Sequence, residues 1–313
     1  MAAVPFREVL AEQRAHLPLL ATTETCSGGT YIVTGANQGL GREALKTLVR
    51  LGARKVIAAV RNIESGKEAR VEIEKETGTQ DVIEVWPLDL ASNESVKAFA
   101  KVVTDKLDRI DGVIENAGVA LVHWSTVEGH ESCIKVNVIG TVLLAVLLLP
   151  KLEESGRKFN IQPRLSIVTS EAAWQAKSEV ERIKDNPRQK WNDGQNADPA
   201  KVYDLRPPCD DYFQADSYRN RYPLSKAIQV FVIRELAALV PVSRSGVIIN
   251  LVNPGLCKTK LGRHASLSMR VQIAIGNFLA GRSVEMGSRT LLHGVVADKE
   301  SHGCYLSACE IKQ

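Results

Sequence analysis

The chain has 313 residues, 44% of them hydrophobic, and its formal net charge is +4. A chain of this length can bury a sizeable core, and one large α/β domain is as plausible as two small ones, although no linker stands out. The small charge and the scattered Lys and Arg residues do not indicate nucleic-acid binding.

Residues 1–29 precede the first expected strand as an N-terminal extension. They lack a signal-peptide pattern because charged residues such as Arg7 and Glu12 break up the apolar positions. Phe6 and Leu17–Leu20 favour instead a short amphipathic helix that packs on the domain. The six cysteines have no metal-ligand spacing, so we expect reduced thiols and no metal site. A cytoplasmic protein is therefore expected.

Short β-branched runs alternate with helical stretches along residues 30–313, which is typical of a Rossmann-type, doubly wound parallel sheet in a single domain. The longest wholly apolar run, Val142–Leu149, is too short to cross a bilayer and predicts a buried helix rather than a membrane span. The expected strands are Tyr31–Thr34, Val56–Val60, Val82–Trp86, Gly112–Glu115, Leu165–Thr169, Val247–Val252 and one near Cys304–Ser307.

The first expected strand leads into a glycine-rich turn and then a helix. The turn reads Gly35-Ala36-Asn37-Gln38-Gly39-Leu40-Gly41, and the helical stretch is Arg42–Leu51. Glycines there let the backbone approach a pyrophosphate, and a helix N-terminus offers unpaired N–H groups and a positive dipole end. A glycine turn without a ligand is the alternative, but the flanking strand and helix favour nucleotide binding.

The residue after the second strand decides which nucleotide is expected. An acidic side chain there would bind the ribose 2′-hydroxyl of NAD, whereas an arginine accommodates the 2′-phosphate of NADP. Arg61 follows Val60, which favours NADP (NADPH). In the alternative, Arg61 is a solvated surface charge and Glu64 supplies the acid, while Arg42 either helps Arg61 or is ordinary helix surface.

Tyr222 and Lys226 lie four residues apart, a spacing that stacks a phenol beside an ammonium group on one helix face. A free tyrosine has a pKa of roughly 10, so a neighbouring positive charge that favours phenolate is what proton transfer near neutrality requires. The pair therefore indicates proton-transfer chemistry, although this spacing also arises by chance in many proteins.

Thr34-Gly35-x-x-x-Gly39-x-Gly41 and Tyr222-x-x-x-Lys226 together resemble the short-chain dehydrogenase/reductase family. Further motifs follow in the family's order over about residues 30 to 310: Asp89-Leu90, similar to its adenine-contacting pair; Asn116-Ala117-Gly118, similar to its Asn-Asn-Ala-Gly strand end; Asn137, similar to its helix asparagine; Ser170, similar to its catalytic serine; and Asn253-Pro254-Gly255 with Thr259, similar to the motif that borders the nicotinamide. Glu115 departs from the family, which usually has an asparagine there.

The resemblance implies a hydride transfer between the nicotinamide and a carbonyl carbon, with Tyr222 giving or taking the proton. It implies that Ser170 holds the reacting oxygen, that Lys226 lowers the Tyr222 pKa and binds the ribose, and that Asn137 fixes a water linking Lys226 to solvent. The residues that it implies for NADP binding are Gly35, Asn37, Gln38, Gly39, Leu40, Gly41, Arg61, Asp89, Leu90, Asn116, Ala117, Gly118, Tyr222, Lys226, Pro254, Gly255 and Thr259. Each of three of these residues also has a purely structural explanation. Ser170 suits a strand end, Asn137 a helix cap or kink, and Asp89 the start of a turn.

Ser170 and Tyr222 are 52 positions apart, so an insertion occupies about residues 171–221. Such insertions resemble those of retinol-dehydrogenase-like members and of fungal natural-product reductases. A second variable segment, about 256–282, is expected to form the substrate lid. Aromatic residues spread through the insertion argue against simple disorder: Trp191, Tyr203, Tyr212, Phe213 and Tyr218. Side chains of the lid either line a pocket or merely pack the lid: His264, Met269 and Phe278.

Three functions remain open. The first is an NADP-dependent oxidoreductase that acts on a carbonyl or alcohol of a lipophilic or polyketide-like small molecule, as a ketoreductase of secondary metabolism does. The second is a non-redox isomerase or cyclase that uses the same Ser-Tyr-Lys site. The third, a nucleotide-sensing regulator, is disfavoured because it has no need to keep Ser170, Tyr222 and Lys226 together. The expected partner is the small-molecule substrate, and a homodimer stays open.

Overall fold

A single eight-stranded sheet forms the centre of the molecule in the computed structural model, which describes residues 6–121, 125–176, 221–259, 261 and 267–312. The strand order is β10-β9-β8-β7-β4-β1-β2-β3, and the strands are parallel except for β10, which pairs antiparallel with β9. The strands are β1 Thr30–Thr34, β2 Lys55–Val60, β3 Ile83–Pro87, β4 Gly112–Glu115, β7 Arg164–Val168, β8 Ile248–Asn253, β9 Tyr305–Ser307 and β10 Glu310–Lys312. A separate hairpin pairs β5 (Thr126–Val127) with β6 (His130–Glu131).

The predicted fold class is confirmed, and each predicted strand is displaced by no more than one residue at either end. Strand β10 was not predicted. Its residues are charged or exposed, so it has none of the β-branched apolar pattern by which the buried strands were recognised.

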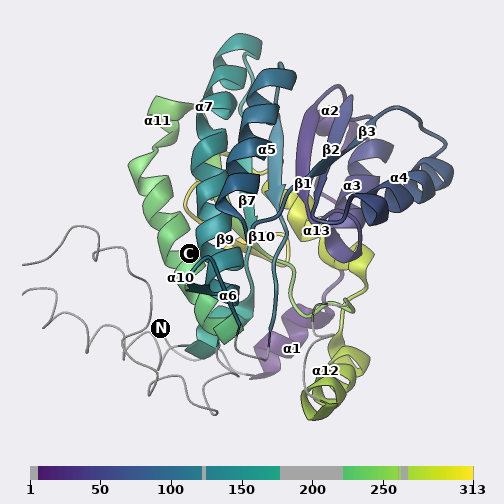
Figure 1. The fold of residues 1–313 in the computed structure, drawn as a ribbon. Coiled ribbons are helices and arrows are strands. Elements are labelled where there is room, and N and C mark those ends of the chain that lie inside the picture. Colours follow the sequence, from purple (N-terminus) through teal and green to yellow (C-terminus); the bar gives the residue numbers. More distant parts are fainter. Residues whose placement is uncertain (1–5, 122–124, 177–220, 260, 262–266, 313) are drawn as a thin grey trace, which may run out of the picture.

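Helices cover both faces of the sheet (Figure 1). Helix α3 packs against α4 and α13 on one face, while α5 and α10 pack against α7 on the other. The long helices are α3 Gly39–Arg50, α4 Ile63–Thr77, α5 Asn93–Lys106, α7 Thr141–Phe159, α10 Arg221–Leu239, α12 Leu267–Ala280 and α13 Val284–Gly294. The shorter elements are α1 Phe6–Arg14, α2 Thr23–Cys26, α6 Ser132–Ile134, the π-helix η1 Lys135–Gly140, the 3-10 helices η2 Glu171–Ala176 and η7 Lys299–Ser301, and α11 Val242–Ser245.

The sheet is buried on both faces, and this explains why its strands are apolar throughout. Alternate side chains of a strand point to opposite faces. Ile32 and Val113 accordingly belong to the core under α5, α7 and α10, whereas Val33 and Ile114 belong to the core under α3 and α13. Each fully buried aliphatic side chain contributes about 1.5–3 kcal/mol to folding, so the two cores hold the layers together.

One continuous helical stretch, Ser132–Phe159, is apolar enough to cross a membrane by length and composition, with a mean hydropathy of 2.2 in its most apolar window. Of that window, 61% is buried inside the protein, because α7 packs between α5 and α10 against the sheet. The stretch is therefore a core helix of the protein, as we predicted from the apolar run Val142–Leu149. On the described part of the chain it is the only segment that passes the length and composition test.

The strand order reverses between β1 and β4. From β1 the chain builds outward through β2 and β3, and it then returns to the other side of β1 with β4, β7 and β8. In open α/β sheets, ligands bind outside the carboxyl ends of the strands at such a point. The loops that follow β1, β4 and β7 therefore meet where the sequence motifs were expected to act.

Candidate functional site

The turn after β1 has the backbone that its glycines allow. Gly35 and Gly39 both have positive φ values, 66° and 59°, which L side chains rarely adopt. A Cβ at Gly41 would lie 2.6 Å from the Asn116 Nδ2 atom, so α3 packs against this turn without room for a side chain. Gln38 is the N-cap of α3 but makes no side-chain capping bond. The cradle and the uncapped helix N-terminus fit a pyrophosphate.

The segment after β4 is tied directly to that turn. The Asn116 side-chain amide donates to the Thr34 carbonyl at 2.9 Å, and the Ala117 N–H donates to Thr34 Oγ1 at 2.8 Å. A Cβ at Gly118 would lie 3.1 Å from Asn137 Oδ1 and 3.8 Å from Lys226 Nζ. This strand end therefore connects the glycine turn to the Asn137 and Lys226 side chains.

Asn137 is completely buried within the π-helix η1. Its side chain accepts from the Val119 N–H at 2.9 Å and donates to the Val119 carbonyl at 2.8 Å and to Ser225 Oγ at 2.9 Å. The wider π turn is a frequent feature of functional sites. Asn137 thus joins the segment after β4 to α10, which carries the Tyr-Lys pair.

Ser170, Tyr222 and Lys226 lie together at the end of β7. The Ser170 hydroxyl is hydrogen-bonded to the Tyr222 phenol. Lys226 Nζ lies 5.9 Å from the centroid of the Tyr222 ring and donates to the Val168 carbonyl at 2.8 Å. Helix α10 packs closely on η2, the 3-10 helix that follows Ser170, and this packing brings together three side chains that are distant in sequence.

Burial acts on both titratable groups of this set. It raises the pKa of the Tyr222 phenol, against the hydrogen bond from Ser170, which acts to lower it. It lowers the pKa of Lys226 to about 7. Burial therefore favours the neutral form of both side chains.

The segment after β8 closes the other side of the glycine turn. Gly255 has φ +73°, and its N–H donates to Asn253 Oδ1 at 3.0 Å. Pro254 is buried. The Thr259 methyl group would lie 3.9 Å from a Cβ at Gly39. Residues 254 and 255 are thus placed at the carboxyl end of β8, and Thr259 lies beside the glycine turn.

Arg61 and the Asp89-Leu90 pair lie at the carboxyl ends of β2 and β3. Arg61 is exposed, directly before Asn62, whose side chain caps α4 by accepting from the Ser65 N–H. Asp89 Oδ1 accepts from the Ala91 N–H at 2.9 Å, as in a turn, and Leu90 is buried. Arg61 is thus exposed at the end of β2, and Asp89 lies in a turn just beyond β3.

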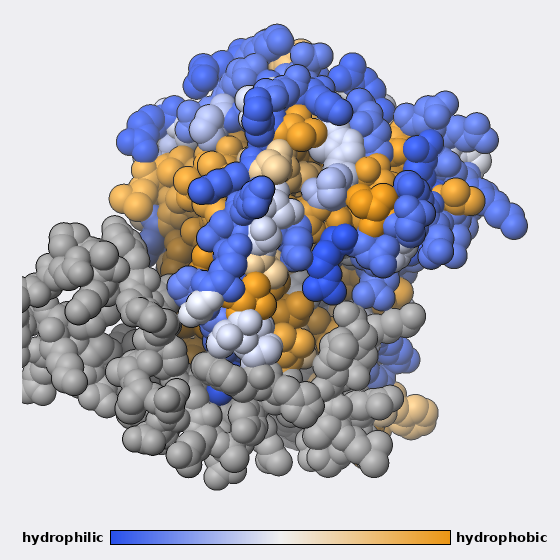
Figure 2. Space-filling view, in the orientation of Figure 1, coloured by the Kyte–Doolittle hydropathy of each residue, from blue (hydrophilic) through white to orange (hydrophobic). Residues whose placement is uncertain are grey.

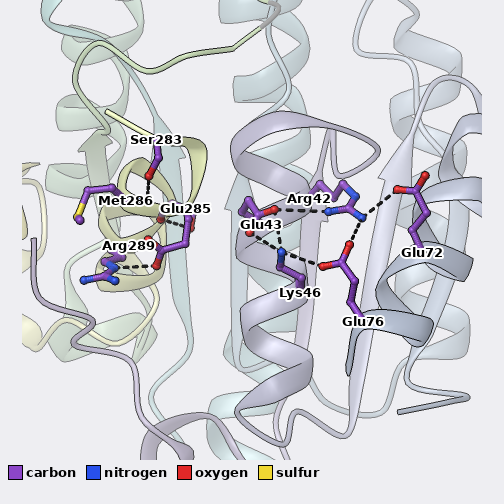
Figure 3. Close-up of polar contacts among 10 residues, drawn as sticks. Arg42, Glu43, Lys46, Glu72, Glu76, Ser283, Glu285, Met286 and Arg289 are labelled. Atoms are coloured by element: carbon purple, nitrogen blue, oxygen red, sulfur yellow. Dashed lines mark hydrogen bonds and ion pairs between the residues drawn. The ribbon is translucent and has the colours of Figure 1, made fainter. Parts of the chain in front are cut away.

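The Arg42 side chain reaches α4. It forms ion pairs with Glu72 at 2.9 Å and Glu76 at 2.8 Å, and Lys46 also pairs with Glu76 at 3.0 Å (Figure 3). These contacts hold the pKa of Glu76 down to about 2. Arg42 therefore links α3 to α4. Glu64, the acid that would bind the ribose of NAD in the alternative interpretation, forms an ion pair with Lys67 on the exposed surface of α4.

Glu115 is the departure from the family motif, and it is almost completely buried at the end of β4. Neither of its carboxylate oxygens has a hydrogen-bond partner among the described residues. Burial raises the pKa of this carboxyl well above its ordinary value. A protonated, neutral side chain accounts for an acid in such a place.

Sequence reasoning missed Gln229, which contacts both Asn137 and Lys226. Its signal was available, because it is the single polar residue in the otherwise apolar run Ala227–Ile233. It also missed Gln13 and Arg282, which bind the backbone at the ends of the segment expected to be the lid, since Gln13 lies more than 200 positions away from Leu256 and from Arg282 in the sequence.

Several predictions concern residues outside those that the structure describes. Among them are His264 in the lid and the aromatic residues of the insertion: Trp191, Tyr203, Tyr212, Phe213 and Tyr218. The side chain of Met269 is likewise not described. Phe278 on α12 is 87% exposed and borders a surface pocket that Arg14 and Met286 also line.

A Rossmann-type sheet with a serine, a tyrosine and a lysine gathered beside its glycine turn defines the class of dinucleotide-dependent oxidoreductases. Comparison with solved structures supports the fold. A short chain dehydrogenase from Shigella flexneri, complexed with NADP, superposes with a TM-score of 0.63 at 20% sequence identity, covering 92% of this chain and 100% of that one. The oxidoreductase yciK from E. coli has a TM-score of 0.65 at 22% identity, covering 94% and 99%.

The sequence comparisons identify the family. The short chain dehydrogenase family model matches residues 30–170. The short chain dehydrogenase/reductase dmxR8 of Cryptosporiopsis sp. is 39% identical over 92% of this chain and 84% of its own length. The short chain dehydrogenase atnD of Emericella nidulans is 38% identical over 91% and 85%. The chain belongs to the short-chain dehydrogenase/reductase family, as its motifs predicted.

Proposed function

We propose that the protein is an NADPH-dependent reductase that transfers hydride to the carbonyl carbon of a lipophilic small molecule, or from the corresponding alcohol. The observation that carries this proposal is the Ser170–Tyr222 hydrogen bond with Lys226 Nζ 5.9 Å from the Tyr222 ring, next to Gly118. A phenol, a hydroxyl and an amine in this arrangement can bind a carbonyl oxygen and supply its proton.

The residues around the site fit the nucleotide. The glycine turn Gly35–Gly41 would hold the pyrophosphate, and Asn116, Ala117 and Gly118 would border the ribose and nicotinamide, as would Pro254, Gly255 and Thr259. Asp89 and Leu90 would lie against the adenine. NADPH, when bound, supplies the hydride. The exposed Arg61 at the end of β2 favours the 2′-phosphate, and two solved relatives carry NADP or NADPH.

Each side chain of the set would then have one role. The Ser170 hydroxyl would donate a hydrogen bond to the substrate oxygen and polarise the carbonyl. The Tyr222 phenol, whose proton burial retains at neutral pH, would donate that proton to the same oxygen as it gains charge. Lys226 would hold the ribose and, in its ammonium form, stabilise the phenolate that results.

The substrate is proposed to be apolar and of natural-product type. The fungal relatives support an assignment to secondary metabolism, with this chain acting as a ketoreductase. Trp174 of η2 is 46% exposed, and its ring centroid lies 5.6 Å from that of Tyr305. Apolar surface therefore follows directly after Ser170. The insertion whose first residues form η2 is proposed to extend this surface into one wall of the substrate site.

A cytoplasmic homodimer is proposed as the working form. Val146 on α7 and Phe231 and Leu239 on α10 are exposed apolar side chains, and Figure 2 shows hydrophobic surface on the side of the molecule where these helices lie. Contiguous apolar surface of this kind marks protein interaction sites.

Turnover of NADPH with a panel of apolar ketones and quinones tests the proposal. Tyr222→Phe is expected to lower kcat by about a hundredfold or more, because the proton donor is lost, while NADPH affinity measured by fluorescence stays near that of the wild type. Tyr31→Phe is the matched control, since this buried tyrosine lies at the other end of β1. Conversion of a substrate without NADPH consumption would favour a non-redox isomerase or cyclase instead.

A further inference from the structure

The side-chain amide of Gln229 joins two groups of the candidate site. Its Nε2 atom donates to the main-chain carbonyl of Asn137 at 2.8 Å, and its Oε1 atom accepts from Lys226 Nζ at 3.1 Å. Gln229 is 1% exposed, and both bonds are buried. It lies three residues after Lys226 on α10, so the two side chains leave the helix on the same face.

The Asn137 carbonyl lies within the π-helix η1. In an α-helix the N–H of Thr141 would donate to the carbonyl of Asn137, four residues earlier. Here the Thr141 N–H donates to the Val138 carbonyl instead. Gln229 Nε2 donates to the Asn137 carbonyl from α10, so this bond joins the π-helix to the helix that carries Lys226.

Only one orientation of the Gln229 amide satisfies both partners. If the oxygen and nitrogen were exchanged, the NH₂ group would face the donor Lys226 and the oxygen would face the Asn137 carbonyl, so both contacts would be repulsive. The amide is therefore held as a fixed dipole whose negative end points at Lys226 Nζ. A buried amide in this state conducts no proton, because it would have to donate and accept at the same time through a disfavoured tautomer.

We propose, on the basis of the function proposed above, that Gln229 is the positioning residue of Lys226 and makes the Asn137-to-Lys226 link that the resemblance had assigned to a water. The link then carries orientation and charge stabilisation but no proton. Lys226 Nζ donates to Val168 O and Gln229 Oε1, and the remaining N–H of its ammonium form is directed by these two toward the site. Proton exchange accordingly occurs from the side of Tyr222 and the substrate.

No other charged or titratable group among the described residues near Lys226 is placed to accept a hydrogen bond from its ammonium group in place of Gln229. On its own helix the nearest is the Tyr222 phenol, and on α6 it is the Cys133 thiol, whose pKa burial raises to about 12, so that it is neutral at pH values where Lys226 titrates. Arg221 and Glu131, 4.0 Å apart, lie further along the contact between α10 and α6. On β7 and η1 the groups that contact the Lys226–Gln229 pair are the main-chain carbonyls of Val168 and Asn137.

The titration of Lys226 in the free protein tests the proposal. Lysine labelled with ¹³C at Cε can be followed by NMR against pH, and the Lys226→Met spectrum assigns the signal. Gln229→Leu is expected to shift the Lys226 titration to lower pH by about one unit, a tenfold change in proton affinity, because the ammonium loses an acceptor. Gln229→Glu is expected to shift it to higher pH, because a carboxylate is a stronger acceptor for the ammonium.

The control separates positioning from general loss of stability. Asn250→Leu removes another completely buried amide, which donates to the Gly294 carbonyl at 2.9 Å and to Ser301 Oγ at 3.3 Å, away from Lys226. It is expected to lower Tm as much as Gln229→Leu does but to leave the Lys226 titration unchanged. A Lys226 titration that stays the same in both Gln229 variants would overturn the proposal.

A second readout separates this proposal from the proposed function. NADPH binding by Gln229→Leu is expected to weaken several-fold, since Lys226 would no longer be held against the ribose. If NADPH binds to neither the wild type nor the variant while the Lys226 titration shifts as expected, the positioning role stands and the proposed function fails.

Discussion

The side-chain amide of Gln13 pairs with the peptide group of Leu256 as a neighbouring strand would, although the two residues are 243 positions apart. Gln13 Nε2 donates to the Leu256 carbonyl at 2.6 Å, and the Leu256 N–H donates to Gln13 Oε1 at 3.1 Å. A third bond joins Gln13 Nε2 to the Ala280 carbonyl at 3.0 Å. Gln13 thus connects the N-terminal extension to both ends of the segment expected to be the lid.

Buried Arg282 strengthens the same connection. Its guanidinium donates to the main-chain carbonyls of Glu12 at 2.6 Å, Gln13 at 3.2 Å and Pro254 at 2.9 Å. Helix α1 also contacts α12, and the two helices lie next to each other in Figure 1. The N-terminal extension is therefore bound to both ends of the segment expected to be the lid, beside Pro254.

Gln13→Leu is expected to lower the free energy of unfolding by about 1–2 kcal/mol, because the part-buried backbone groups of Leu256 and Ala280 lose their partner. It is also expected to raise KM for substrate, since the lid base is loosened. Urea unfolding and steady-state kinetics measure the two effects. Arg14→Ala is the control, because the bond that Arg14 donates to the Leu279 carbonyl, at 3.3 Å, is exposed to solvent. Equal effects of the two substitutions would contradict this role of Gln13.

Arg61→Asp is expected to weaken NADPH binding by about tenfold or more and to favour NADH, because a charge-assisted contact to the 2′-phosphate is replaced by repulsion. Fluorescence titration with both nucleotides measures the preference. Arg42→Ala should leave it unchanged, since Arg42 is engaged with Glu72 and Glu76. A loss of preference in Arg42→Ala and not in Arg61→Asp would transfer the phosphate contact to Arg42.

Glu115→Gln is expected to flatten the pH dependence of stability. The pKa of Glu115 is raised in the folded state above its ordinary 4.5, so the folded protein holds this proton more tightly than the unfolded chain. The stability that this tighter proton binding contributes is complete below about pH 4.5 and is lost as the pH rises through the folded pKa. Over that range the free energy of unfolding falls by up to about 1.4 kcal/mol per pH unit. Unfolding free energies at about pH 5 and about pH 8 should therefore diverge between wild type and variant, with the variant the more stable at the higher pH.

Glu310→Gln is the control for that measurement. Lys312 lowers the pKa of Glu310, and the pair is exposed, so its removal should change stability little and with the opposite pH dependence. Parallel pH profiles for wild type and Glu115→Gln would show that Glu115 does not hold a proton in the folded protein.

Gly41→Ala is expected to weaken NADPH binding and to lower Tm. Alanine favours a helix by about 1 kcal/mol over glycine, but its Cβ would lie 2.6 Å from Asn116 Nδ2 and 2.7 Å from the Gly35 carbonyl, so the turn must shift. In Gly276→Ala on α12 the nearest atom is Leu256 Cδ2 at 3.4 Å, and this control should bind NADPH as the wild type does. Unchanged affinity and Tm in Gly41→Ala would contradict a close-packed glycine turn.

The local features of the site were predictable because they depend on neighbours along the chain. Gly35 and Gly39 adopt the positive φ values that the turn after β1 needs, and Tyr222 and Lys226 are placed together by the pitch of α10. Parallel strands buried on both faces are recognisable as short apolar runs, whereas exposed β10 has no such pattern and was not predicted.

The sequence by itself determined the fold class, the family and the order of the motifs, because periodicity, glycine positions and motif spacing are properties of consecutive residues. Only the tertiary structure decided that Gln229 meets the carbonyl of Asn137, 92 positions away, and that Arg282 meets the backbone of Gln13, 269 positions away. It likewise paired Arg42 on α3 with Glu72 and Glu76 on α4. A polar side chain binds whichever complementary group the packing of helices and strands presents to it, and that packing depends on the whole chain.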